Sequence, residues 1–319
     1  MKNKLALSLF LLCFVSSTNL VPLIHEQEWS ITELLSIESD YSSHSPSLDV
    51  DQNGMVHVSY VEDMAIYYQR NIPGIGWTGY EQVSDNILDN RAPSLRIDDD
   101  GTVHVAWQHQ IPSVWSVPTV NYKNYESGIG WRNEETIGGS GGSRNDWEVS
   151  WASPPSLYIG FDGTVHIAYP IACAEILNYV KPSRIVYTSY TPTGGWSDRV
   201  NITTESVGES TAPSLGVGVD GSIHIAWVDE TSYAGSGSDS DIFYKKYDPD
   251  AGWMVTEVVS TESVGESTAP SLGVGVDGSI HIAWVDETSY AGSGSDSDIF
   301  YKKYESARTF NKDKCIEWL

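Results

Sequence analysis

The chain has 319 residues, with 43 acidic side chains against 18 basic ones and a formal net charge of −25 at pH 7. Such a chain repels nucleic acid and anionic lipid, so neither is expected as a partner, whereas attraction of Ca²⁺ or of basic ligands stays open. Its 3 cysteines provide neither a disulfide framework nor a Cys/His pattern typical of a metal site, so stability must come from a hydrophobic core and no metal site is assigned.

The first residues have the pattern of an export signal. Lys2 and Lys4 precede an apolar stretch at residues 5–15, and small residues up to Ser17 suit cleavage. The apolar stretch is shorter than the roughly 20 residues that a membrane span needs. We therefore expect a signal peptide at 1–17 and a secreted or cell-surface protein, with no membrane insertion after cleavage.

An internal repeat dominates the rest of the chain. Pro-Ser-Leu occurs five times, a histidine follows each proline by eleven residues, and in four units a tyrosine precedes a tryptophan by nine. The five histidines are His57, His104, His166, His224 and His281. The repeats lie near 46–84, 93–138, 155–203, 213–260 and 270–304. Repeats of roughly 50 residues are typical of propeller blades.

Each repeat has the pattern of four short strands. Pro-Ser-Leu opens the first strand, and an Asn-Gly or Asp-Gly pair such as Asn53-Gly54 then favours a tight hairpin turn. A second strand like Val-His-Val-Ala-Trp and an aromatic third strand follow, and a glycine-tryptophan turn leads into the fourth. The sequence therefore predicts an all-β, five-bladed β-propeller of four-stranded antiparallel blades over residues 18–304, followed by a C-terminal tail at 305–319.

The fifth repeat lacks its tryptophan strand. Residues 29–36, however, match Trp77 to Ser84 in pattern. We therefore predict that the N-terminal strand completes the last blade and closes the ring, which removes a free sheet edge. Residues 204–247 and 261–304 are identical over 44 positions, which indicates a recent duplication of one blade.

The variable connections predict which face binds a ligand. The segments between the second and third strands, and between one blade and the next, vary in length and emerge on one face, where binding surfaces are usually built. Aromatic rings there can stack on sugars, and carboxylates can accept hydrogen bonds from sugar hydroxyl groups. The candidate ligand-binding residues are Trp107, Trp115, Trp147, Trp151, Tyr169, Asp229 and Asp286, with Tyr233 and Tyr290 in the same loops. Trp107 recurs in register as Trp227 and Trp284, which favours a core role, whereas Trp115, Trp147 and Trp151 break the repeat.

Two further patterns indicate structural roles and not catalytic or metal-binding ones. A single active site does not need five equivalent histidines, so these are interpreted as structural hydrogen-bonding groups. Asp49 to Gly54 resembles the start of a Ca²⁺-binding loop, but Tyr60 stands where the chelating glutamate belongs. A hairpin turn accounts better for this segment.

The blade pattern resembles the sialidase-like repeat propellers, described as BNR or Asp-box-like proteins. This resemblance covers residues 29–304 and implies the propeller fold. A true Asp-box reads Ser-x-Asp-x-Gly-x-Thr-Trp, and turns such as Thr193 to Trp196 depart from it. A sialidase also needs an arginine triad, a tyrosine–glutamate pair and an acidic residue as acid/base, and none of the arginines in this chain has a recognisable Arg-Ile-Pro setting.

Three functions follow from these observations. The leading one is a non-catalytic propeller that binds carbohydrate or extracellular protein through its loop-rich face. The second is a sialidase-like glycoside hydrolase, which would need two carboxylates about 5 to 9 Å apart. Asp229 and Asp286 are duplicated copies and fit repeated binding sites better than one catalytic centre, so the catalytic residues stay unknown. The third is a structural module of a surface layer.

Overall fold

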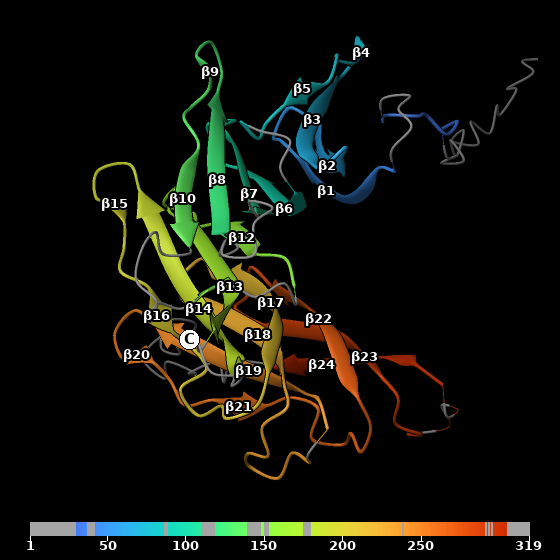
Figure 1. The fold of residues 1–319 in the computed structure, drawn as a ribbon, viewed down its shortest axis with the longest axis vertical. Coiled ribbons are helices and arrows are strands. Elements are labelled where there is room, and N and C mark those ends of the chain that lie inside the picture. The colour runs from blue at the N-terminus through green and yellow to red at the C-terminus, as the bar shows by residue number, and fades with distance from the viewer. Residues whose placement is uncertain are drawn as a thin grey trace, which may run out of the picture. The chain divides into compact units, whose positions relative to one another are not determined.

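The computed structural model describes residues 30–36, 42–85, 89–109, 119–138, 148–149, 153–174, 180–237, 239–290, 292, 294 and 296–304. The chain divides into two compact units, Met1–Leu35 and Ser36–Leu319. In the described part of the second unit every regular element is a β-strand (Figure 1). No helix long and apolar enough to span a bilayer occurs among the described residues.

The strands form five antiparallel sheets, one for each repeat, which are named blades 1 to 5 here. Blade 1 comprises β1 (His44–Val50), β2 (Val56–Glu62), β3 (Ala65–Ile72), β4 (Gly76–Trp77) and β5 (Glu81–Gln82). Blade 2 comprises β6 (Asn90–Ile97), β7 (Val103–His109), β8 (Thr119–Glu126), β9 (Gly130–Trp131) and β10 (Glu135–Gly138). Blade 3 comprises β11 (Glu148–Val149), β12 (Ser156–Ile159), β13 (Val165–Ala174), β14 (Val180–Thr191), β15 (Gly195–Trp196) and β16 (Val200–Asn201).

Blades 4 and 5 contain the duplicated sequence. Blade 4 comprises β17 (Ser210–Val217), β18 (Ile223–Asp229), β19 (Asp241–Asp248), β20 (Gly252–Trp253) and β21 (Glu257–Val258). Blade 5 comprises β22 (Ser267–Val274), β23 (Ile280–Asp286) and β24 (Asp298–Tyr304). The all-β class and the five blades of the predicted propeller are thereby confirmed.

The outer strand differs from the prediction in one detail. In blades 1 to 4 it consists of two short pieces that both pair with the third strand, as β4 and β5 pair with β3. After Trp77 the chain leaves the ladder and rejoins it at Glu81. In blades 1, 2 and 4 the tryptophan and the glutamate four residues later therefore lie at two separate anchoring points of one outer strand, whereas Val200 takes the place of the glutamate in blade 3.

The hairpin between the first two strands forms as predicted. Gly54 has a φ of +75°, a conformation that glycine adopts without steric cost. The carboxylate of Asp51 accepts hydrogen bonds from the backbone N–H groups of Asn53 and Met55, at 2.9 and 2.8 Å. Asp49 accepts one at 3.0 Å from the N–H of Ile97 in blade 2. Both carboxylates thus stabilise the blade and its neighbour, in agreement with the hairpin interpretation.

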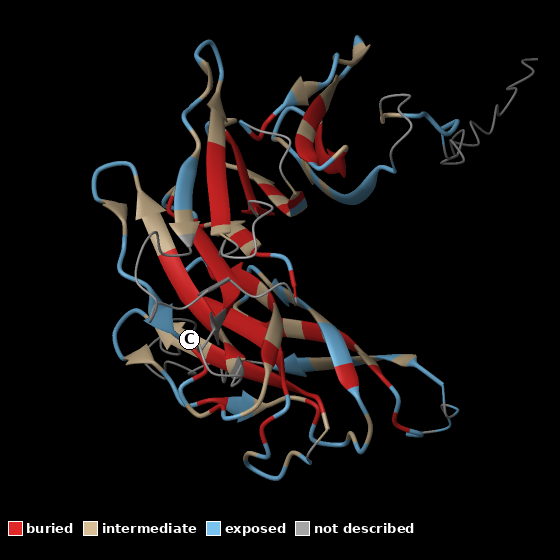
Figure 2. Ribbon diagram, in the orientation of Figure 1, coloured by how far each residue is buried: buried red, intermediate tan, exposed pale blue. Residues whose placement is uncertain are grey.

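Hydrophobic cores lie between consecutive blades. The core between blades 1 and 2, for example, combines Ile66 and Tyr68 with Leu95 and Trp107. Equivalent clusters join blades 2 and 3, blades 3 and 4, and blades 4 and 5. Figure 2 shows the buried residues concentrated along the middle strands of the blades, with exposed residues at the turns. Blades 2, 3 and 4 therefore each pack large side chains against a neighbour on both of their faces.

A serine hydroxyl bridges each pair of neighbouring inner strands. The serine of Pro-Ser-Leu accepts a hydrogen bond from the backbone N–H of the Pro-Ser-Leu leucine in the next blade. The four bonds are Leu95 to Ser47 at 2.9 Å, Leu157 to Ser94 at 3.2 Å, Leu215 to Ser156 at 3.0 Å and Leu272 to Ser214 at 2.9 Å. The invariant serine of the repeat therefore connects one blade to the next.

The five repeated histidines are structural, as predicted. In every blade the Nδ1 atom lies 2.6 to 2.7 Å from the hydroxyl oxygen of a tyrosine on the third strand. The pairs are His57–Tyr68, His104–Tyr122, His166–Tyr187, His224–Tyr244 and His281–Tyr301. Burial lowers the pKa of His166 and of His224 to about 4, so both are neutral at pH 7.

The duplicated sequence occupies two different environments. Ile242 and Tyr244 on β19 are 0% and 8% exposed because blade 5 covers them, whereas their copies on β24, Ile299 and Tyr301, are 75% and 58% exposed. The fifth sheet has three strands among the described residues, and residues 30–36 are assigned no strand. Trp29 lies outside the described residues, so closure by an N-terminal strand stays a prediction.

Candidate ligand-binding face

The variable connections emerge at one end of the blades, as predicted from their lengths. In blade 4, Ser210 at the start of the inner strand pairs with Asp229, and Asp229 pairs with Asp241 at the start of the third strand. The tight turns at Asp220-Gly221 and before Trp253 lie at the opposite ends of these strands. The loop face consists of residues 204–209, 230–237 and 239–240 of blade 4 and of the described residues among their copies in blade 5, which are 261–266, 287–290, 292, 294 and 296–297.

Two predicted ligand-binding aromatics lie inside the blades. Trp107 is fully buried, and its indole N–H donates a 2.8 Å hydrogen bond to the side-chain oxygen of Asn90. Tyr169 is equally buried, and its hydroxyl group donates to the backbone oxygen of Ile137 at 3.1 Å. Burial raises the pKa of Tyr169 to about 12. In this structure both side chains pack in the core and have no surface with which to touch a ligand.

Asp229 and Asp286 are buried at the centre of two equivalent hydrogen-bond networks. Asp229 is 0% exposed; its Oδ2 atom accepts hydrogen bonds from the indole of Trp227 and from Ser210, each at 2.8 Å, and a short one from Ser206. Its Oδ1 atom accepts from the backbone N–H of Thr231 at 2.9 Å. Asp286 has the same role for Trp284, Ser267 and Thr288. These carboxylates therefore hold the loop face together from beneath it.

The remaining predicted ligand-binding residues are Trp115, Trp147 and Trp151, which lie outside the described residues. Their role stays a prediction.

The loop face presents a tyrosine on a rigid support in each duplicated blade. The hydroxyl oxygen of Thr231 accepts hydrogen bonds from the N–H groups of Val207 and Gly208, both at 2.9 Å, which fastens the two loops of blade 4 to each other. Two residues later, the ring of Tyr233 lies 6.1 Å from that of Phe243 on β19. A hydrogen bond from its N–H to Ser236 at 2.9 Å fixes the backbone at Tyr233.

Blade 5 repeats this arrangement with a more accessible ring. Thr288 accepts from the N–H groups of Val264 and Gly265 at 2.8 and 3.1 Å. Tyr290 lies 5.9 Å from Phe300 and is 50% exposed. A phenol ring held against a phenylalanine, with half of its surface open to solvent, can stack on the apolar face of a ligand such as a sugar.

Several other acids near the loop face already have partners. Glu209 accepts hydrogen bonds from the backbone N–H of Ser183 at 3.1 Å and, over a shorter distance, from its hydroxyl group. Glu266 accepts from the N–H of Ser240 at 3.4 Å. Glu230 and Glu287, by contrast, are exposed next to the two tyrosine loops. The face thus combines aromatic platforms with free carboxylates that can accept hydrogen bonds from hydroxyl groups.

Asp241, at the start of β19, has an environment that resembles that of a catalytic acid. Burial raises its pKa, Oδ1 accepts a hydrogen bond from Ser260 at 2.6 Å, and Oδ2 is buried without a hydrogen-bond partner. Its residue is only 2% exposed, however, so the carboxyl group does not reach the surface where a substrate would lie. Within the described residues, no group of three or more His, Cys, Asp or Glu side chains is arranged to hold a metal ion.

Comparisons with known proteins identify the fold. No family model matches the chain. No curated protein matches it. Among solved structures, an α-L-arabinanase from Penicillium chrysogenum, complexed with arabinobiose, is similar at a TM-score of 0.53 and 14% identity, over 80% of this chain and 81% of that one.

Two further structures are similar to a comparable degree. An α-L-arabinofuranosidase from Fusarium graminearum, in complex with an iminosugar inhibitor, gives a TM-score of 0.51 at 14% identity, over 84% and 82% of the two chains. A protein of unknown function from Dyadobacter fermentans gives 0.51 at 12% identity, over 78% and 76%. At such identities these similarities establish the propeller fold alone, and they do not single out the sialidase-like repeat proteins.

The sequence did not reveal two features of the loop face. One is the pair of threonine clamps, Thr231 and Thr288, whose hydroxyl oxygens each connect two loops. The other is the packing of Phe243 and Phe300 against the tyrosines. Asp229 had a usable signal, because residues two apart on a strand point to the same side and Trp227 therefore faces the same way. No sequence signal predicts the contact between Tyr290 and Phe300, because this contact depends on how β23 and β24 pair.

Proposed function

We propose that this protein is an extracellular, non-catalytic propeller that binds carbohydrate through the loop face of blades 4 and 5. The observation that carries the proposal is the pair of supported tyrosines, Tyr233 and Tyr290, each of which follows an exposed glutamate by three residues. Aromatic stacking needs a ring that does not move on binding, and the threonine clamps and phenylalanine contacts supply that rigidity. The predicted secreted or cell-surface location is where such glycans occur.

The proposal is tested by affinity electrophoresis against a panel of soluble plant and bacterial polysaccharides. Tyr290→Ala is expected to weaken retention by about tenfold, which corresponds to roughly 1.4 kcal/mol for one stacked ring. Tyr80→Ala is the matched control, because Tyr80 in blade 1 is 54% exposed but lies outside the loop face. Equal retention of the Tyr290→Ala variant and the wild type, on a polysaccharide that binds, would rule out this placement of the site.

A glycoside hydrolase is the second candidate, favoured by the fold of the arabinanase and the arabinofuranosidase. Such an enzyme needs two carboxylates that both reach the scissile bond. Asp229 and Asp286 do not fit, because their oxygens are buried and already hydrogen-bonded. Release of reducing ends from arabinan, or of the aglycone from a fluorogenic sialoside or arabinofuranoside, would favour this function over binding alone.

A further inference from the structure

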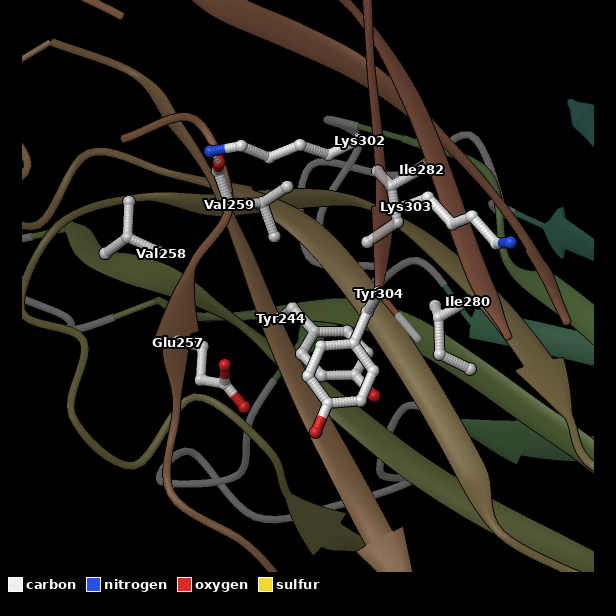
Figure 3. A pocket seen from close by; sticks show the side chains of 9 residues that line it. All are labelled: Tyr244, Glu257, Val258, Val259, Ile280, Ile282, Lys302, Lys303 and Tyr304. Atoms are coloured by element: carbon white, nitrogen blue, oxygen red, sulfur yellow. Dashed lines mark hydrogen bonds between the residues drawn. The ribbon is translucent and has the colours of Figure 1, made fainter. Parts of the chain in front are cut away.

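A cavity of about 150 Å³ opens between the outer parts of blades 4 and 5, away from the loop face (Figure 3). The buried side chains of Ile280 and Ile282 form an apolar wall of this cavity. The rings of Tyr244 and Tyr304 line it as well, and the carboxylate of Glu257 points toward them (Figure 3). An apolar cavity of about this size can hold one aromatic ring. The cavity therefore has room for a ring and offers it a carboxylate.

The equivalent place is filled by a tryptophan indole in three other pairs of blades. Between blades 1 and 2, Trp131 lies edge-on to Tyr68 and to Tyr125, with ring centroids 5.4 and 5.5 Å apart. By strand register, Tyr244 and Tyr304 are the counterparts of these two tyrosines. The other two pairs have Trp196 at 5.2 Å from both Tyr122 and Tyr190, and Trp253 at 5.5 and 5.3 Å from Tyr187 and Tyr247.

The carboxylate beside the cavity also has counterparts. The indole N–H of Trp131 donates to Glu81 at 3.0 Å, and that of Trp196 donates to Glu135 at 2.8 Å. Each of these glutamates pairs across the ladder with the buried tyrosine of its own blade, and Glu257 pairs with Tyr244 in the same way. Blade 3 has Val200 at this position. The cavity therefore has the acceptor that two of the three indole sites use.

The repeat sequence of blade 5 departs from the others at the position of the indole. Each of the three tryptophans follows a tyrosine of its own third strand by six residues, whereas the residue six positions after Tyr304 is Phe310, which has no N–H to donate. Tyr304 is 59% exposed, while its three counterparts are half-buried. Lys302 still donates to the backbone oxygen of Val259 at 2.7 Å, as the equivalent lysines do in blades 2 and 4. The junction thus keeps the surroundings of an indole site and leaves its outer tyrosine open to solvent.

We propose that this cavity binds a small aromatic molecule of the indole class, with its ring against Tyr304 and Ile280 and its N–H donating to Glu257. Edge-to-face contacts with tyrosines favour an aromatic ring over an aliphatic one. The carboxylate favours a ring that carries an N–H group over one that does not. The net charge of −25 favours a neutral or cationic indole over an indole carboxylate. The cavity shares no residue with the loop face, so this inference is independent of the proposed carbohydrate binding.

Titration of the full chain with indole, followed by two-dimensional amide NMR, tests the proposal. The amide signals of Glu257 and Tyr304 are expected to shift, whereas that of Tyr125, which contacts Trp131, stays unchanged. Benzofuran has the same shape without the N–H group and is expected to bind about tenfold more weakly. This difference should disappear in Glu257→Val, which copies Val200 of blade 3. Equal affinities of indole and benzofuran for the wild type would overturn the proposal.

A tyrosine variant supplies a second readout. Tyr304→Ala removes an exposed ring and is expected to weaken indole binding about tenfold, because the ligand loses an aromatic contact. The matched control is Tyr125→Ala, which alters a site already filled by Trp131 and should leave the affinity for indole unchanged. Equal binding of indole by Tyr304→Ala and the wild type would overturn the proposal. So would a lack of indole binding to the full chain, the result expected if the predicted closure by residues 29–36 fills the same place.

Discussion

Asp229 provides a sharp test of whether the acids beneath the loop face support the fold or contact a ligand. In an Asp229→Ala variant, the buried indole N–H of Trp227, the hydroxyl groups of Ser206 and Ser210, and the N–H of Thr231 all lose their acceptor. Each buried donor without a partner costs about 1 to 3 kcal/mol, and the small hydroxyl groups can find new partners by rotation. We therefore expect the variant to lose about 3 to 5 kcal/mol of unfolding free energy.

The measurement is urea unfolding at pH 7 and 25 °C, followed by tryptophan fluorescence and by circular dichroism. Glu230→Ala is the control, because its side chain is exposed beside the same network and should change stability by less than about 0.5 kcal/mol. A Trp227→Phe substitution removes one of the orphaned donors, so the double variant Asp229→Ala/Trp227→Phe should be less unstable than the sum of the two single variants. An Asp229→Ala protein as stable as the Glu230→Ala control would refute the structural role of this carboxylate.

Three further predictions concern the contacts within and between blades. Because the folded pKa of His166 is about 4, below its ordinary 6.5, the unfolded chain binds the proton more readily than the folded one. The contribution of His166 to stability is therefore fully present above about pH 6.5, and its loss costs about 3 kcal/mol as the pH falls to 4, in addition to the loss from His224. The decline in unfolding free energy across this range should be shallower in His166→Gln. Ser156→Ala should cost about 1 kcal/mol in urea unfolding, since the N–H of Leu215 loses its partner, and an unchanged midpoint would contradict the bridging role. Burial alone would raise the pKa of Glu205, but hydrogen bonds from Thr256, Thr204 and Lys245 hold this pKa below its usual value. Lys245→Met should therefore raise the pKa of Glu205, as measured by NMR titration of its carboxyl group. An unchanged pKa would contradict the ion pair between Lys245 and Glu205.

Much of the fold could be read from the sequence because each repeat carries strong local signals. Residues that recur at fixed spacing predict the first strand of each blade, the turn at Gly54 and the structural role of the five histidines. The break in the outer strand after Trp77 could not be predicted, because it depends on which residues of β3 the two pieces pair with. Hydrophobic patterning does not report such a change of register.

The loop face was predictable in its position but not in its composition. Loop lengths alone located it, yet they also placed Asp229 among the ligand-binding candidates, whereas Asp229 is buried. The burial of Trp107 agrees with the core role that its recurrence in register favoured over ligand binding. An aspartate at a strand end has the same sequence signature whether it meets solvent or a neighbouring indole. Only the contacts in the folded structure show whether such an aspartate is exposed or buried.

The serine bridges have a consequence for how this chain changes in evolution. Each repeat carries both halves of the contact, a leucine N–H that donates backward and a serine hydroxyl that accepts from the blade ahead. Such an interface is head-to-tail, so a copied repeat matches both of its neighbours without any new mutation. The bridge from Leu272 to Ser214 joins the two identical blades with the geometry that joins Leu215 to Ser156 in unlike ones. The number of blades is thus not determined by any single junction, because every junction of this kind accepts one more repeat.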